Sequence, residues 1–209
     1  LHVLAEGRIQ AAAEADIARA REIVAQHGGR EVENTIPKII RANPFGPLNS
    51  ILGPEGERWA PIHGLVPHSR AAACFEAFEK LFETRRAEME DLGVYYGTLI
   101  AAVGNAGMVI EPCLYWPDVG NPLIEDTIEK AHFKRLPAQS DNPQARALMR
   151  ELKEAILDIF GAHDAAHFQI GRTYRYRDEL DPRADRMLES IKCEVDPQGL
   201  MNPGSLGLA

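Results

Sequence analysis

Two long apolar stretches joined by a glycine-rich turn constrain the fold of this chain more than any other feature. The stretches are Val94 to Val103 and Met108 to Trp116, and the turn between them reads Gly104-Asn105-Ala106-Gly107. Asparagine and glycine accept the positive φ angles that tight hairpin turns need. The pattern therefore predicts an antiparallel β-hairpin near the middle of the chain.

Helical periodicity is typical of most of the remaining sequence. A long helix is predicted from Pro67 to Leu92, with Ser69 as its cap and Gly93 as its stop. Its apolar positions recur at helical spacing and suit packing on a sheet: Phe75, Phe78, Phe82 and Met89. Other helices are predicted at Arg8 to His27, Leu123 to Phe133, Pro143 to Phe160 and Pro182 to Glu194, and short ones at Pro37 to Arg41 and Leu48 to Leu52.

Further strands are predicted at Leu1 to Ala5, Glu31 to Asn34, Arg58 to Val66 and His167 to Ile170. The order of strands and helices favours the α+β class, with a ferredoxin-like antiparallel sheet covered by helices. With 209 residues, of which 45% are hydrophobic, the chain is large enough for one compact core. We therefore expect a single domain over residues 1–209.

Charge and cysteine content exclude several classes of protein. A net charge of -8 argues against a nucleic-acid backbone or an anionic membrane as partner, and no apolar run reaches the roughly 20 residues that span a bilayer. The three cysteines Cys74, Cys113 and Cys193 are too far apart for a disulfide framework or a zinc ligand pair. No phosphate-binding glycine motif is present. These features predict a cytoplasmic protein without a metal site.

The last part of the chain carries the most specific motif. Helix-forming residues that include Lys192 run into Asp196-Pro197-Gln198-Gly199-Leu200-Met201-Asn202-Pro203-Gly204. This resembles the C-terminal signature of FAD-linked oxidases of the vanillyl-alcohol oxidase and p-cresol methylhydroxylase superfamily. The segments Arg58 to Pro67, Gly93 to Leu99 and Met108 to Tyr115 are similar in order and spacing to the substrate domain of the phenol-oxidising members.

The resemblance implies a domain organisation and a reaction. Residues 1–209 would form the substrate domain that caps the flavin, and an FAD-binding domain of the same polypeptide, expected to lie outside this chain, would hold the rest of the FAD. A hydride would pass from a para-substituted phenol or a small 2-hydroxy acid to the flavin. We expect the chain to be inactive without the FAD-binding domain; homo-oligomerisation stays open.

The same resemblance implies candidate site residues. Arg172 would lie near the flavin N1 and C2 carbonyl, where a positive charge stabilises the reduced ring. His63 and His167 are candidates for catalysis, His167 because an imidazole pKa of about 6.5 suits proton transfer. The tail motif adds Asn202, Pro203 and Gly204 as cofactor-binding residues, and substrate contacts are expected from Tyr96 and Tyr174.

Each candidate also has an ordinary structural interpretation. Arg172 can be a solvated arginine, the tyrosines can be core residues, and Glu111 can lie on the solvent side of its strand or be a buried carboxylate. The metal-ligand histidines of the hydroxy-acid branch and the Tyr-Arg pair of the phenol branch are not matched here. A non-catalytic ferredoxin-like binding or oligomerisation domain is therefore kept as the alternative function.

Overall fold

The computed structural model describes residues 2–33, 35–169 and 171–208, which belong to two compact units, residues 1–47 and 48–209. That residues 1–209 form one substrate domain stays a prediction. The first unit contains helices α1 (Gln10–Gln26) and α2 (Ile36–Ala42), which confirms both predicted helices. Residues 2–5 and 31–33 form no strand, contrary to the prediction; Leu1 and Asn34 lie outside the described residues. A strand is stable only when a neighbouring strand pairs with it, and the described part of this unit contains none.

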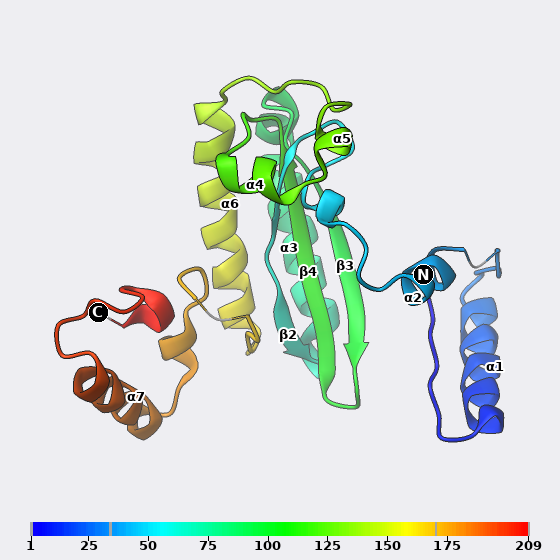
Figure 1. Cartoon of the computed structure of the whole chain (residues 1–209). Helices are drawn as coiled ribbons and strands as arrows, with labels where there is room; N and C mark the ends of the chain where they lie inside the picture. Colours follow the sequence, from blue (N-terminus) through cyan, green and yellow to red (C-terminus); the bar gives the residue numbers. More distant parts are fainter. Residues whose placement is uncertain (1, 34, 170, 209) are drawn as a thin grey trace. The chain divides into compact units, whose positions relative to one another are not determined.

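The second unit is built on an antiparallel sheet of strands β1 (Arg58–Pro61), β2 (Gly64–Pro67), β3 (Tyr95–Val103) and β4 (Gly107–Trp116). Strand β4 is central: β3 pairs with one of its edges, and β1 and β2 follow one another along the other edge (Figure 1). The predicted hairpin and the α+β class are confirmed. The strand predicted from Arg58 to Val66 is interrupted at Ile62 and His63, because the backbone N–H of His63 donates to the side chain of Tyr174.

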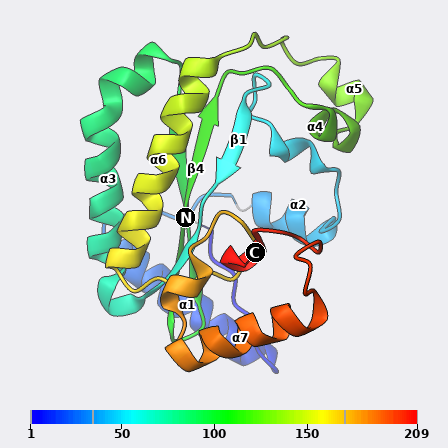
Figure 2. The ribbon, with the colours of Figure 1, turned by 90° about the vertical axis from the view of Figure 1, so that its left-hand side faces the viewer.

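Helices α3 (His68–Asp91) and α6 (Pro143–Ala162) cover one face of this sheet (Figure 2). Gly93 ends α3 with a φ of +68° as predicted, but Ser69 is not its cap, because the cap position is Pro67 and no side chain bonds there. Alternate residues of β4 meet the helices, so the core lies between the sheet and the helix pair. The largest buried core side chains are Ile62, Phe78, Phe82, Ile110, Leu114, Leu148, Leu152, Ile156 and Phe160.

The other predicted elements are partly confirmed. The helix predicted from Leu123 to Phe133 is divided into α4 (Pro122–Thr127) and α5 (Lys130–Phe133), because Ile128 is extended (ψ 147°) and buries its side chain. Helix α7 is confirmed at Pro182–Val195. Three short 3-10 helices are η1 (Leu48–Ile51), η2 (Tyr176–Glu179) and η3 (Ser205–Gly207).

The strand predicted at His167 to Ile170 is wrong for its described residues. The chain pairs with the sheet only one residue earlier, where Ala166 forms an isolated bridge with Leu65, and Ile170 lies outside the described residues. Among the described residues, no helix combines the length and the apolarity needed to cross a membrane.

The contact between β2 and α6 leaves no room for a side chain at Gly64. A Cβ at this position would lie 2.4 Å from Phe160 Cδ1 and 3.0 Å from Ala165 Cβ. Gly64→Ala is therefore expected to lower the free energy of unfolding by about 1–3 kcal/mol, measured by urea denaturation. Gly97→Ala on β3 is the matched control, because a Cβ there meets nothing within 4 Å. Equal urea midpoints for the two variants would contradict this packing.

Candidate functional site

His63 meets His167 and Tyr174, which lie more than 100 positions later in the sequence, beside β2. The Tyr174 hydroxyl oxygen lies 2.7 Å from His63 Nδ1 and accepts the backbone N–H of His63 at 3.1 Å. His167 Nδ1 lies 2.9 Å from the His63 carbonyl oxygen, and the rings of His167 and Tyr174 stack with centroids 4.5 Å apart. Two predicted catalytic residues and one predicted substrate contact thus form a single cluster.

The hydrogen bonds of this cluster determine which ring atoms carry protons. His167 Nδ1 must donate, because a carbonyl oxygen only accepts, so Nε2 of neutral His167 is an acceptor, and it has no partner among the described residues. The backbone N–H of Gln169 donates to His63 Nε2 at 3.4 Å, so Nδ1 carries the ring proton of neutral His63 and donates to Tyr174. The hydroxyl proton of Tyr174 is then left to bond a ligand.

His63 is the buried member of the cluster, with 1% of its surface exposed. Burial, with a smaller contribution from the charge of His167, lowers the pKa of His63 to about 4. The ring of Phe168 covers that of His63 at a centroid distance of 4.1 Å. His63 is therefore neutral at pH 7 and orients Tyr174 without carrying charge.

Local contacts hold the segment that carries Tyr174. At its start, Ala166 pairs with Leu65 through two backbone hydrogen bonds of 2.8 and 2.9 Å. On either side of Tyr174, Thr173 accepts from Lys153 of α6 at 3.2 Å, and Arg175 pairs with Asp158 of α6 at 2.6 Å. The position of the tyrosine ring is thus fixed by helix α6 as well as by His63.

The cluster borders the face of the sheet that α3 and α6 do not cover. Side chains of β4 alternate between the two faces, and Glu111 is half-buried on the uncovered one. On the same face Tyr115 lies opposite Trp59 and Tyr95, and the Tyr95 and Tyr115 rings stack at 4.9 Å. Tyr95 retains 40% of its surface exposed. The uncovered face is therefore an aromatic and apolar surface with a carboxylate at its centre.

The tail motif is ordered around Asp196. This carboxylate pairs with Lys192 and accepts the backbone N–H groups of Leu200 and Met201, both at 2.9 Å. The bond to Lys192, followed by those to the backbone, holds the pKa of Asp196 below its ordinary value. Lys192 also donates to the Met201 carbonyl oxygen at 2.5 Å. Asp196 thus fixes the turn that leads to Asn202.

The predicted cofactor-binding residues, Arg172, Asn202, Pro203 and Gly204, lie close together near the turn that Asp196 holds. A Cβ on Gly204 would lie 3.8 Å from Arg172 Nε, and the Leu206 N–H donates to the Gly171 carbonyl oxygen at 2.7 Å. Residues 202–204 are exposed, and Asn202 borders an open pocket of about 460 Å³. The structure therefore brings Arg172 to the Asn-Pro-Gly run and connects both to the segment that carries Tyr174.

Tyr96 does not belong to either group. Its ring stacks on Phe82 of α3 at 3.9 Å, and its hydroxyl oxygen lies 3.3 Å from Glu79 Oε1. Tyr96 thus lies on the helix-covered face, and the structure does not bring it to the other predicted site residues. Within residues 2–33, 35–169 and 171–208, no group of three or more metal-ligating side chains is found.

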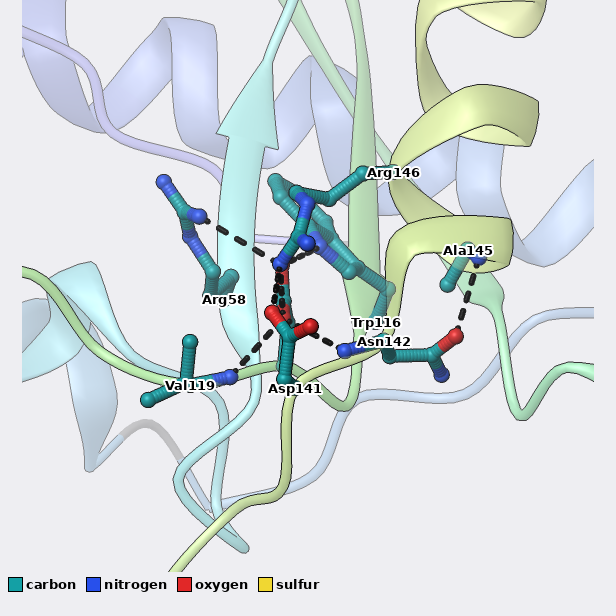
Figure 3. Close-up of polar contacts among 8 residues, drawn as sticks. Arg58, Trp116, Val119, Asp141, Asn142, Ala145 and Arg146 are labelled. Carbon is teal, nitrogen blue, oxygen red and sulfur yellow. Dashed lines mark hydrogen bonds and ion pairs between the residues drawn. The ribbon is translucent and has the colours of Figure 1, made fainter.

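A buried ionic cluster around Asp118 lies at the end of β4 (Figure 3). Asp118 is 1% exposed; it accepts from Arg146 at 2.6 Å and from the backbone N–H of Asn142 at 3.0 Å, and Arg58 approaches at 3.4 Å. Burial opposes ionisation, but the bonds from Asn142, Arg146 and Trp116 hold the pKa of Asp118 below its ordinary value. This cluster joins β1, β4 and the start of α6, so we interpret it as structural.

Phe168 was not predicted from the sequence as a site residue, and Glu111 was left open between a solvent-facing and a buried carboxylate; the structure places it half-buried on the uncovered face. The signal for Glu111 was its position in a strand with alternating side chains, two residues before Cys113 and four before Tyr115. Phe168 gave no signal, since its contact with His63 depends on the path of a loop. No family model, curated protein or solved structure matches the chain.

Proposed function

We propose that this chain is the substrate domain of an FAD-dependent oxidoreductase, with a ferredoxin-like sheet whose uncovered face bounds the substrate site. One observation carries the proposal: His63 converges at the edge of that face with His167 and Tyr174 from a distant loop. A buried neutral histidine that bonds a tyrosine is a costly arrangement for packing alone. The resemblance of the tail to FAD-linked oxidases supports the identity of the cofactor.

The chemistry of the donor set fits FAD. Arg172 offers an exposed guanidinium beside Gly204, and Asn202 offers an amide at the mouth of the open pocket. Carbonyl oxygens of the flavin ring and phosphate oxygens are good acceptors for these groups. Arg172, Asn202, Pro203 and Gly204 would hold the cofactor; when bound, FAD would accept a hydride from a substrate carbon.

The chain's own residues would bind and orient the substrate. The free hydroxyl proton of Tyr174 would donate to a substrate oxygen, and His167 Nε2 would accept a proton from a substrate hydroxyl. His63 would position Tyr174. A para-substituted phenol or a small 2-hydroxy acid is the proposed substrate, and the aromatic residues Trp59 and Tyr115 support the phenol.

Exposed apolar side chains support a partner domain. Helix α7 presents Met187, Ile191 and Val195 on one side, at exposed fractions of 65%, 51% and 73%. We propose that the FAD-binding domain of the same polypeptide covers such surface. Cys74, Cys113 and Cys193 are all free thiols, which supports a cytoplasmic location.

Tyr174→Phe tests the proposed function. We expect it to slow reduction of the bound flavin by about tenfold, because the donor to the substrate oxygen is lost. The variants are made in the polypeptide that includes the FAD-binding domain, and reduction is followed by anaerobic stopped-flow absorbance with 4-methylphenol and with a 2-hydroxy acid. Tyr176→Phe is the control, since Tyr176 is a half-buried tyrosine two residues away. Identical kinetics in both variants would remove Tyr174 from the site, and a protein without flavin would favour the non-catalytic binding domain.

A further inference from the structure

Glu111 is the one acidic residue in strands β1 to β4. On one side, Glu111 lies opposite Leu99 of β3. On the other side, Pro61 pairs with Cys113 and Gly64 pairs with Ile110, so this register places His63 opposite Glu111. Its carboxylate is therefore at the centre of the uncovered face, between the histidine cluster and the exposed side chain of Leu99.

No hydrogen bond or ion pair to the Glu111 carboxylate occurs within the described part of the chain. Burial raises the pKa of Glu111 above its ordinary value. The charge of Glu111 also affects the cluster. Burial is the main cause that raises the pKa of Tyr174, the backbone hydrogen bond from His63 acts against it, and the negative charge of Glu111 raises this pKa further. A half-buried carboxylate without a partner carries a desolvation cost that a ligand can relieve.

Basic residues do not compensate this charge on the sheet. Arg58 is the only basic residue in the four strands, and it lies at the far end of β1, where it approaches Asp118 and the ring of Trp116. A ligand on the uncovered face therefore meets an aromatic and apolar surface with an unneutralised negative charge. An anionic ligand would be repelled there, and a cationic one attracted.

We propose that Glu111 sets the charge preference of this site: it receives a hydrogen-bond-donating or cationic group of the ligand and excludes ligands with a carboxylate. The inference deepens the proposed function, because it takes the ligand of the uncovered face to be the substrate. Of the two substrate classes proposed above, it therefore selects the neutral phenols and rejects the 2-hydroxy acids; it also predicts that benzylic amines bind and that aromatic carboxylates do not.

The test uses three probes that share one ring and differ in charge: 4-hydroxybenzylamine, 4-methylphenol and 4-hydroxybenzoate. Binding to the protein is measured at pH 8 by calorimetry and by quenching of tryptophan fluorescence, since Trp59 lies on this face. The amine is expected to bind at least about tenfold more tightly than the carboxylate. In Glu111→Gln this ratio should fall to within about threefold, because the attraction and the repulsion are both lost.

Glu79→Gln is the matched control, because Glu79 is a carboxylate on α3 that contacts Tyr96 on the helix side of the sheet. It should keep the wild-type ratio. Equal affinity of the wild type for the amine and the carboxylate, binding of none of the three probes, or an unchanged ratio in Glu111→Gln would each overturn the inference. The proposed function would fail through a different result, the absence of flavin reduction. The ratio of amine to carboxylate affinity is measured without flavin chemistry, so the two failures can be distinguished.

Discussion

Asp118→Ala is expected to lower the free energy of unfolding by about 3–5 kcal/mol. The Asp118 side chain is fully buried and accepts two guanidinium groups, an indole N–H and two backbone N–H groups. Alanine removes the acceptor of all these donors at once and leaves Arg58 and Arg146 without their buried partner. The strands and the start of α6 then lose a shared anchor.

Urea denaturation followed by circular dichroism measures this effect. Asp141→Ala is the matched control, because Asp141 pairs with the same Arg146 at 2.7 Å, but its side chain is 65% exposed. Exposed ion pairs contribute little, so the control midpoint should stay close to that of the wild type. If both variants lost the same stability, Asp118 would not be the structural centre of this cluster.

Acidification from pH 6.5 to pH 4 is expected to remove about 3 kcal/mol of stability through His63 alone. The pKa of His63 is lowered from 6.5 in the unfolded chain to about 4 in the folded one. The stability that His63 contributes through its lowered pKa is therefore fully present above pH 6.5. This stability is lost as the pH falls from 6.5 to 4, because the unfolded state binds a proton that the buried ring does not.

Carboxylates also titrate toward the lower end of this pH range. The contribution of His63 is therefore measured as the difference in free energy of unfolding between the wild type and His63→Gln. His63→Gln should be less stable than the wild type at pH 8, and the gap should narrow by about 3 kcal/mol on reaching pH 4. His68→Gln serves as the control, since His68 is exposed at the start of α3. A gap between wild type and His63→Gln that does not change with pH would show that His63 is not buried neutral.

Periodicity predicted the elements that depend on local sequence. The hairpin, α3, α6 and α7 follow from turn residues and apolar spacing, and these signals are complete within each segment. The strands predicted at residues 1–5 and 31–34 are absent from their described residues, 2–5 and 31–33, because pairing is a tertiary property. The break at His63 could not be predicted, since it depends on a hydrogen bond from its backbone N–H to a residue 111 positions away.

The candidate site was predictable only in part. His63, His167 and Tyr174 were named through a resemblance, and their mutual contacts required the path of the loop after Ala166. Tyr96 was named for the same site but lies on the other face: neighbours on a strand alternate, and the sequence did not show which face the helices cover. The buried role of Asp118 could not be predicted from the sequence, because its arginine partners, Arg58 and Arg146, are distant from it along the chain.

The visible absorption spectrum of the natural gene product that contains this chain, before and after denaturation, tests the central proposal most directly. The account predicts flavin absorbance in the native protein, bleached anaerobically by a para-substituted phenol. Release of the pigment on denaturation would show a non-covalent flavin, and retention a covalent one. A colourless protein that also fails to bind added FAD would contradict the proposed function.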